Sequence, residues 1–285
     1  MLIQQKPISR PITEQDRSSV STIIHFGAHV HRHLDWRSPL DWIGKPPFEG
    51  LEINNKLVSI LSCAPDIPTI GWVRVFACEM HNYHEKAWDL LWARTAELLP
   101  DLGIEVVAAI PIQKWFRDLL VQKQFQYLHN IITLTWDPFP ITSQPSLPSG
   151  CQLRRMTQKD LDAVTRIDNL AFEPLWQHSR EMIELAFTQA EIATIAEDGS
   201  GPIGYQITTM TQYGFHLGRL AVLPTVQRKG TGFALVNDLQ NQVFKAGRGR
   251  ITVNTHNTNQ RSIGLYLKAG FIKTRESYPV YQIKI

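Results

Sequence analysis

Hydrophobic and polar positions in the C-terminal half of the chain follow strand and helix periods in turn. Alternating or continuous apolar runs predict strands over residues 152–156, 191–197, 203–211, 215–223, 250–255 and 278–285. Helical spacing predicts helices that end at Phe172 and that cover residues 181–189, 231–246 and 260–269. Thr157 or Asp160 is placed to cap the first helix, and Gly270 to end the last. This order indicates an α/β (α+β) fold with a mixed sheet flanked by helices.

A proline-rich segment separates this half from the residues before it. Four prolines lie within residues 138–150, and proline is excluded from helix interiors and central strands. We therefore expect one domain over residues 1–137, a linker over 138–150 and a second domain over 151–285.

The most informative segment joins the strand over residues 215–223 to the helix that begins at Thr231. Its residues are Gln227, Arg228, Lys229, Gly230, Thr231 and Gly232. The first turn of a helix has unpaired N–H donors and a partial positive charge, and glycine lets an anion approach the backbone. Two neighbouring cations add to this charge. The segment is therefore suited to hold a diphosphate without a metal ion.

Two other phosphate-binding patterns do not fit the chain. The lysine precedes its glycine, which excludes a P-loop, and Thr252 stands where the third glycine of a dinucleotide fingerprint would be. The simpler alternative is that Gly230 and Gly232 only form a turn before the helix.

Three motifs in the second half, taken together, resemble those of the GNAT superfamily of N-acetyltransferases. The first is Ile167-Asp168-x-x-Ala171-Phe172 followed by Trp176, and the second is Gln227-x-x-Gly230-x-Gly232 after Leu220-Ala221-Val222. The third begins at Asn257-x-Asn259 and continues through Leu265-Tyr266 to Gly270-Phe271. The resemblance covers residues 151–285 and departs from the family at Gly264, where alanine is more usual.

The resemblance implies the residues that contact acetyl-CoA. In the family, the strand before the loop diverges from the next strand, and the pantetheine arm of the cofactor pairs with its amides, here those of Leu220 and Val222. Asn257 or Asn259 would bind this arm or only order the start of the following helix. The implied cofactor residues are Leu220, Ala221, Val222, Gln227, Arg228, Lys229, Gly230, Thr231, Gly232, Asn257 and Asn259.

The resemblance also implies a catalytic acid. Tyr266 matches the family's usual general acid, which returns a proton to the departing thiolate; the alternative is that it only packs in the core. His216 is a candidate base, since alternation would place residues 216, 218, 220 and 222 on one face of a strand. Glu173, in the loop that usually shapes the acceptor pocket, is a second candidate.

The N-terminal half repeats the pattern in a weaker form. Strands are expected over residues 72–78, 106–110 and 131–136, and helices over 84–99 and 114–124. Phe125 takes the place of Phe271, but the loop over residues 79–83 has no glycine and contains Glu79. We therefore expect a degenerate GNAT-like domain that lacks the diphosphate loop.

Three histidines in this half raise the question of a metal. In a strand, His29, His31 and His33 would share one face. No second ligand cluster follows them, so we expect no metal site and consider packing, or a place beside the acceptor, as the alternative. The tryptophans, which lie mostly in this half, are expected in the core.

Composition narrows the class of protein. Residues 1–145 carry 13 Lys and Arg against 15 Asp and Glu, whereas residues 146–285 carry 16 against 11, so the half with the loop is basic. A polyanionic cofactor explains this charge, and no basic stripe favours nucleic acid. Three unpaired cysteines, no long apolar run and no signal peptide predict a cytoplasmic protein without a membrane segment.

The function expected is an acetyl-CoA-dependent N-acetyltransferase. It would move an acetyl group to a primary amine, of a small molecule or a protein, by direct transfer in a ternary complex, as a monomer or homodimer. The alternatives are a non-catalytic acyl-CoA sensor or interaction scaffold and, with less support, a nucleic-acid-binding protein. The acceptor is not identified by the sequence.

Overall fold

The computed structural model describes residues 6–138, 147–247 and 249–285, and most of the predicted linker (residues 138–150) lies outside them. The chain forms two compact units. The N-terminal unit comprises Met1–Leu128 with Tyr278–Ile285, and the C-terminal unit comprises His129–Ser277. No helix in the described residues is long and apolar enough to cross a membrane.

This division differs from the predicted domains 1–137 and 151–285, because each unit includes residues from the other side of the linker. In the C-terminal unit, residues 131–136 of strand β9 (Gln126–Trp136) pair with β14 (Ile251–His256). In the N-terminal unit, residues 281–284 of strand β15 (Ile272–Lys284) pair with β8 (Val106–Ala109). Backbone groups of a buried strand require such partners, and the choice between partners is not a local property of the sequence.

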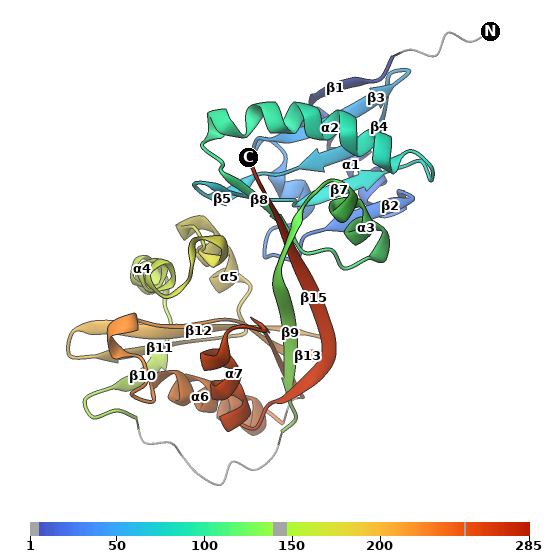
Figure 1. The fold of residues 1–285 in the computed structure, drawn as a ribbon. Helices are drawn as coiled ribbons and strands as arrows, with labels where there is room; N and C mark the ends of the chain where they lie inside the picture. The colour runs from blue at the N-terminus through green and yellow to red at the C-terminus, as the bar shows by residue number, and fades with distance from the viewer. Residues whose placement is uncertain (1–5, 139–146, 248) are drawn as a thin grey trace. The chain divides into compact units, whose positions relative to one another are not determined.

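The C-terminal unit has a mixed sheet in the order β10-β11-β12-β13-β14-β9. The strands not yet defined are β10 (Gln152–Arg155), β11 (Ile192–Asp198), β12 (Gly201–Thr211) and β13 (Gly214–Val222). Helices α4 (Leu161–Ala171) and α5 (Arg180–Thr188) lie on one face, and α6 (Thr231–Lys245) and α7 (Gln260–Lys268) on the other (Figure 1). Each predicted helix and strand of this unit is present, with ends shifted by one or two residues. The predicted last strand, residues 278–285, lies in the N-terminal unit and begins earlier, at Ile272.

One apolar core of this unit lies between the sheet and helices α6 and α7. Leu235, Leu239 and Val243 of α6 are fully buried. Leu239 and Val243 belong to one apolar cluster with Phe215 and Leu217 of β13. The face of the sheet beneath α6 and α7 is therefore apolar.

A bulge divides β13 into two parts with opposite phase. The register with β12 shifts between Ile207 and Thr208, so that Leu217 pairs with Thr208 and Arg219 with Ile207. Gly218 is the extra residue, and side chains beyond it change face. The predicted common face of residues 216, 218, 220 and 222 is therefore wrong.

The N-terminal unit contains a five-stranded sheet in the order β1-β3-β4-β7-β2. Its strands are β1 (Ile8–Pro11), β3 (Phe48–Ile53), β4 (Lys56–Ser62), β7 (Val75–Cys78) and β2 (His29–Arg32). Strands β5 (Pro65–Ile67) and β6 (Ile70–Trp72) pair with each other, and β6 also pairs with β8. The predicted strand over residues 72–78 is thus divided between β6 and β7.

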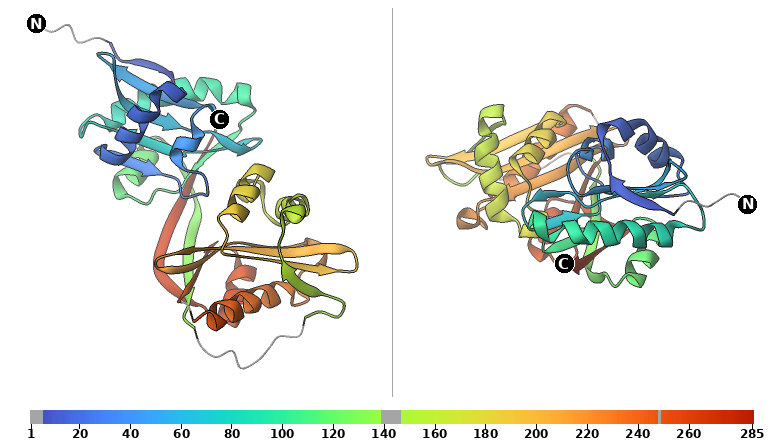
Figure 2. Two further views of the ribbon diagram at one scale, coloured as in Figure 1. Left: turned by 180° about the vertical axis from the view of Figure 1, so that it is seen from behind. Right: turned by 90° about the horizontal axis from the view of Figure 1, so that it is seen from above.

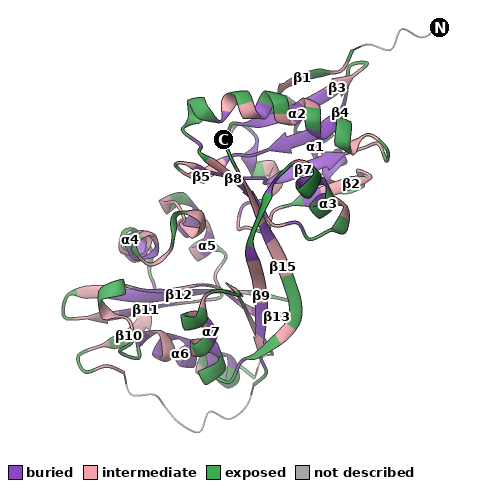
Figure 3. Cartoon of the chain, viewed as in Figure 1, coloured by how far each residue is buried: buried purple, intermediate pink, exposed green. Residues whose placement is uncertain are grey.

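Helices cover both faces of this sheet. Helices α1 (Arg17–Phe26) and α2 (His84–Leu98) lie on opposite sides of it, as the view from above in Figure 2 shows, and α3 (Lys114–Gln122) follows β8. Strands β4 and β7 are buried along most of their length (Figure 3). The rings of Phe76 and Trp88 meet edge to face, with centroids 5.0 Å apart, inside this core. Trp42, Trp72 and Trp88 are buried, as expected, whereas Trp36, Trp92 and Trp115 are only partly buried.

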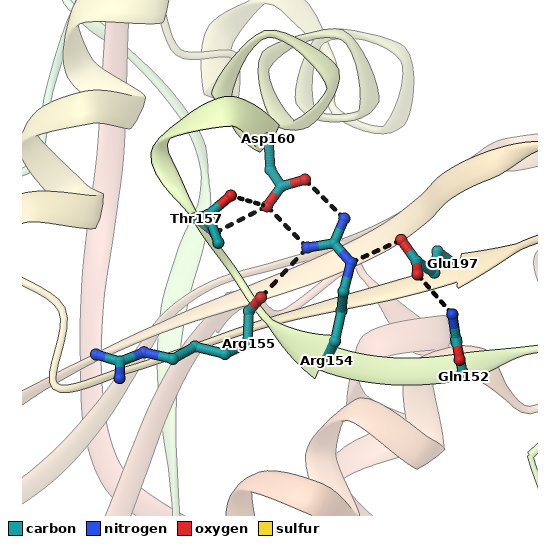
Figure 4. A network of polar contacts seen from close by, with 6 residues as sticks. All are labelled: Gln152, Arg154, Arg155, Thr157, Asp160 and Glu197. Atoms are coloured by element: carbon teal, nitrogen blue, oxygen red, sulfur yellow. Dashed lines mark hydrogen bonds and ion pairs between the residues drawn. The ribbon is translucent and has the colours of Figure 1, made fainter.

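A polar network fixes the start of α4 in the C-terminal unit (Figure 4). Asp160 accepts hydrogen bonds from the backbone and hydroxyl of Thr157, at 2.8 and 2.9 Å, which forms a capping box. Arg154 of β10 donates to both carboxylate oxygens of Asp160, at 2.8 and 2.7 Å, and to Glu197 of β11, at 2.7 Å. The network therefore joins two strands to the helix start, as the predicted cap at Thr157 or Asp160 requires.

The N-terminal unit has the same network at the start of α1. Arg10 of β1 donates to both oxygens of Asp16, at 2.9 and 2.7 Å, and to Glu52 of β3, at 2.6 Å, while Thr13 donates to Asp16. The spacing of arginine, threonine and aspartate is the same in both units. The two halves are thus copies of one structural plan, which extends the predicted repeat to the first strand and helix.

Candidate functional site

The loop before α6 has a backbone conformation that depends on glycine. Gly230 is the N-cap of α6 and has φ of 96°, in the left-handed region that disfavours residues with a Cβ. A Cβ at this position would meet no atom within 4 Å. The glycine is therefore required by backbone conformation and not by a lack of space.

The N-terminus of α6 presents uncapped donors. The first hydrogen bond of the helix runs from Ala234 N to Gly230 O, at 2.9 Å. Within the described residues, the backbone amides of residues 230–233 have no hydrogen-bond acceptor. The hydroxyl of Thr231 is buried and has no hydrogen-bond partner there either. Unpaired amides and a partial positive charge fit a bound anion. Arg228 and Lys229, next to them, are exposed.

An unpaired strand edge adjoins this loop. Strand β13 runs parallel to β14, but the pairing covers only Phe215, His216 and Leu217. Over residues 218–222 this edge of β13 has no strand partner among the described residues. Leu223, directly after β13, donates its N–H to Ile203 O of β12. Alternation along a strand then directs the amides of Leu220 and Val222 to the open edge. These are the two amides that the family resemblance implies for the cofactor arm.

Two close approaches bring the loop, the strand and α7 together. The amide of Gln227 donates to Val222 O at 3.0 Å, which ties the loop back to the end of β13. A Cβ added to Gly232 would lie 3.5 Å from Leu265 of α7 and 3.7 Å from Val222. The second and third predicted motifs therefore meet at one place.

Tyr266 follows Leu265 on α7. Its ring is buried, with its centroid 5.6 Å from that of Phe271, and it belongs to the apolar cluster under the sheet. Burial raises the pKa of the phenol well above its usual value, so the hydroxyl carries its proton at neutral pH. A buried phenol is consistent with both the packing and the catalytic interpretation.

The two predicted asparagines have structural partners. Asn257 accepts a hydrogen bond from Asn130 N at 3.1 Å, which extends the pairing of β14 with β9. Asn259 is the N-cap of α7 and accepts from Ser262 N at 3.1 Å. Contact with a cofactor stays a prediction for both.

His216 pairs with Thr252, one residue before the pairing of β13 with β14 ends. Its Nδ1 is 2.9 Å from the hydroxyl of Thr252, and that hydroxyl donates to Phe215 O. Since the hydroxyl proton is used there, Nδ1 of His216 donates to Thr252 and Nε2 keeps a free lone pair. Burial lowers the pKa of the imidazole, which is therefore neutral at pH 7.

A buried ion pair, which the sequence analysis missed, holds the segment after α4. Arg219 of β13 donates to both carboxylate oxygens of Asp168, at 2.6 and 2.8 Å, and also to Trp176 O. Tyr205 donates to Asp168 at 2.5 Å, and the carboxylate is fully buried. The sequence did contain a signal for this buried pair, because Asp168 interrupts the apolar face of a predicted helix. Glu173, the remaining predicted site residue, is exposed in the segment that this pair holds.

The equivalent strand edge of the N-terminal unit is filled by the chain. Strand β6 pairs in parallel with β8 through Ile70, Gly71 and Trp72. The chain continues as β7, whose edge opposite β4 pairs with β2 along its whole length. The edge that is open in β13 is therefore occupied in the N-terminal unit.

The three histidines of the metal hypothesis lie on and beside β2, each against another ring. His29 stacks on His84, with centroids 3.9 Å apart, His31 stacks on Phe116 at 4.0 Å, and His33 lies 4.7 Å from Trp72. His31 is fully buried, which lowers its pKa to about 3. In the part of the chain that the structure describes, no group of His, Cys, Asp or Glu is arranged to hold a metal ion.

Comparison with known proteins identifies a family for part of the chain. Residues 161–271 match the model of the acetyltransferase (GNAT) family. No curated protein sequence matches the chain.

Solved structures resemble the chain over nearly its whole length. A GCN5-related N-acetyltransferase from Sphaerobacter thermophilus has a TM-score of 0.61 at 15% identity, with 98% of this chain and 95% of that chain covered. A tandem GNAT protein from the clavulanic acid biosynthesis pathway has a TM-score of 0.67 at 12% identity, with 98% of each chain covered. A GCN5-related N-acetyltransferase from Anabaena variabilis has a TM-score of 0.67 at 11% identity, with 97% of this chain and 72% of that chain covered. At these identities the likeness shows the fold alone. The C-terminal unit therefore carries a domain of the GNAT acetyltransferase family, in a chain that has the tandem GNAT fold.

Proposed function

We propose that the protein transfers an acetyl group from acetyl-CoA to a primary amine within a ternary complex. The observation that supports this most strongly is the uncapped N-terminus of α6 beside the open edge of β13. An anion and an extended amide-containing arm are the two chemical features that coenzyme A presents to such a site.

The residues of the loop and strand bind the cofactor in this proposal. The amides at the start of α6, with Arg228 and Lys229, hold the diphosphate, and the amides of Leu220 and Val222 pair with the arm. Val222 O is already used by Gln227, so this residue contributes its amide alone. Acetyl-CoA, when bound, supplies the acetyl group as a thioester.

Tyr266 and His216 move the protons. The attacking nitrogen must be neutral, and His216 Nε2 accepts the proton that the ammonium group loses. The nitrogen then bonds to the acetyl carbon, the carbon–sulfur bond breaks, and the Tyr266 hydroxyl protonates the thiolate. The second proton of the attacking nitrogen restores the phenol. The products are an amide, a free thiol and one proton released from the imidazole to water.

The protein holds one acyl-CoA in this proposal. The N-terminal unit offers no open edge on β7, because β2 pairs with it, and its loop over residues 79–83 has no glycine. This unit is then a non-catalytic partner of the C-terminal unit.

A thiol-release assay over a panel of amines tests the enzymatic role. Tyr266→Phe should bind acetyl-CoA like the wild type and lose about a hundredfold in kcat, a typical loss for a general acid. Leu267→Ala, on the exposed side of α7 next to Tyr266, is the control and should keep its activity. If no amine releases thiol while acetyl-CoA binds, the protein is an acyl-CoA sensor or scaffold instead.

A further inference from the structure

The face of the sheet opposite α6 is polar around β14. Ile251 and Val253 of β14 are buried in the apolar cluster, so alternation places Thr252, Asn254 and His256 on the other face. Asn254 accepts a hydrogen bond from Thr133 of β9 at 3.0 Å. Asn254 is nevertheless exposed, although β14 lies between two strands. The sheet is therefore accessible from this side.

Three rings gather where β14 ends on this face. The ring centroids of His129 and His256 are 4.9 Å apart, and that of Trp176 lies 5.7 Å from His129 and 6.4 Å from His256. Nε2 of His129 is buried without a hydrogen-bond partner in the described residues, and this side chain is only 9% exposed. An unpartnered buried nitrogen in a ring cluster points to a missing ligand.

The charge at this cluster is negative. Glu173, three residues before Trp176, raises the pKa of both imidazoles, but burial lowers these pKa values more strongly, so both rings are neutral at pH 7. The guanidinium of Arg219, which donates to Trp176 O, is neutralised by Asp168. A carboxylate beside three neutral rings favours a cation.

We propose that Glu173, Trp176, His129 and His256 hold a cationic nitrogen of the acceptor, remote from the nitrogen that is acetylated. This inference rests on the proposed function and adds the substrate class. The cation would lie over the Trp176 ring, near the Glu173 carboxylate, and donate to Nε2 of His129. From Thr252, which pairs with the proposed base His216, to His256 is four residues, or roughly 13 Å along a strand. The acceptor is therefore an extended amine with a second positive charge.

Paired acceptors test this subsite. Straight-chain diamines are compared with the alkylamines of equal length, in which a methyl group replaces the second amine. For the wild type, kcat/KM should be about tenfold or more higher for the long diamine than for its alkylamine, because KM is lower. The short diamine and its alkylamine should differ little. Glu173→Gln should abolish the preference, whereas Glu276→Gln, which removes the same charge from an exposed site on β15, should keep it. A dibasic peptide of similar span distinguishes a peptide acceptor from a polyamine.

Equilibrium binding gives a second readout that needs no acyl-CoA. Calorimetry should show the long diamine binding about tenfold more tightly than the alkylamine, and Trp176→Leu should remove the difference while its circular dichroism stays native. Equal binding of the two amines, or a preference that Glu173→Gln leaves intact, overturns the subsite. Failure of every amine to release thiol would overturn the proposed function instead, and the binding comparison would still decide the subsite.

Discussion

Arg219 and Asp168 form a two-point ion pair inside the C-terminal unit, with Nε–Oδ2 and Nη2–Oδ1 distances of 2.6 and 2.8 Å. The pair joins β13, whose edge is open, to α4. Because Arg219 also donates to Trp176 O, the strand and the segment that bears Glu173 are fixed to each other. The proposed cofactor and acceptor residues thus share one support.

Removing this support should destabilise the unit strongly. Asp168→Asn leaves the buried guanidinium without a counter-charge, and a loss of about 3–5 kcal/mol in the free energy of unfolding is expected. Urea unfolding measures it. Asp162→Asn is the control, since Asp162 pairs with Arg180 while its own side chain is 90% exposed, and it should change stability little. Equal effects of the two variants would contradict the structural role of the buried pair.

The capping network predicts a loss of stability in acid. Hydrogen bonds from Arg154 lower the pKa of Asp160 from 3.8 to about 2. Because the folded pKa is the lower one, the stabilisation is complete above pH 3.8 and disappears as the pH falls through 2. Asp160→Asn should therefore lower the free energy of unfolding by about 1–2 kcal/mol at pH 7 and by almost nothing near pH 2. The value at pH 7 is reduced because Arg154 is partly exposed. Unfolding curves of both proteins across this range would show whether the difference vanishes.

The proposed acid and base predict the pH profile of the reaction. Burial lowers the pKa of His216, so its Nε2 stays unprotonated down to a pH below 6.5, and the acid limb of kcat/KM should lie there. Burial raises the pKa of Tyr266, so no alkaline limb from this phenol should appear below pH 10. His216→Ala should lower kcat/KM about a hundredfold and remove the acid limb. An unchanged acid limb in His216→Ala would show that another group accepts the proton.

The filled edge of β7 predicts the stoichiometry of binding. Calorimetric titration with acetyl-CoA should give one site per chain, because β2 occupies the edge in the N-terminal unit that is open in β13. Two sites of similar affinity would show that β2 can be displaced.

Elements with strong local signals were predictable from the sequence. Helices α6 and α7 begin at the predicted residues and end one residue before the predicted ends. Gly270, which ends α7, has φ of 83°, as a helix-ending glycine should. The meeting of the loop, the open edge and α7 was implied by the family resemblance, and periodicity alone would not have given it.

Features that depend on partners distant in the sequence were not predictable. The bulge at Gly218 reverses which face His216 shares with its neighbours, and it exists only in the pairing with β12. Strand β9 begins five residues before the predicted start, at Gln126, because strand length follows pairing. The repeated Arg-x-x-Thr-x-x-Asp spacing was visible in the sequence but carried no meaning until both copies were seen to cap a helix.

Binding of acetyl-CoA to Gly230 variants tests the central claim most directly. Gly230→Asp places a carboxylate at the start of α6, and Gly230→Asn places a neutral side chain there that tolerates φ of 96° equally well. Gly249→Asp, beyond the far end of the 15-residue helix, about 22 Å away, controls for charge. Calorimetry should show at least a hundredfold loss of affinity for Gly230→Asp, a loss below tenfold for Gly230→Asn and none for Gly249→Asp. Wild-type affinity in Gly230→Asp would contradict the account.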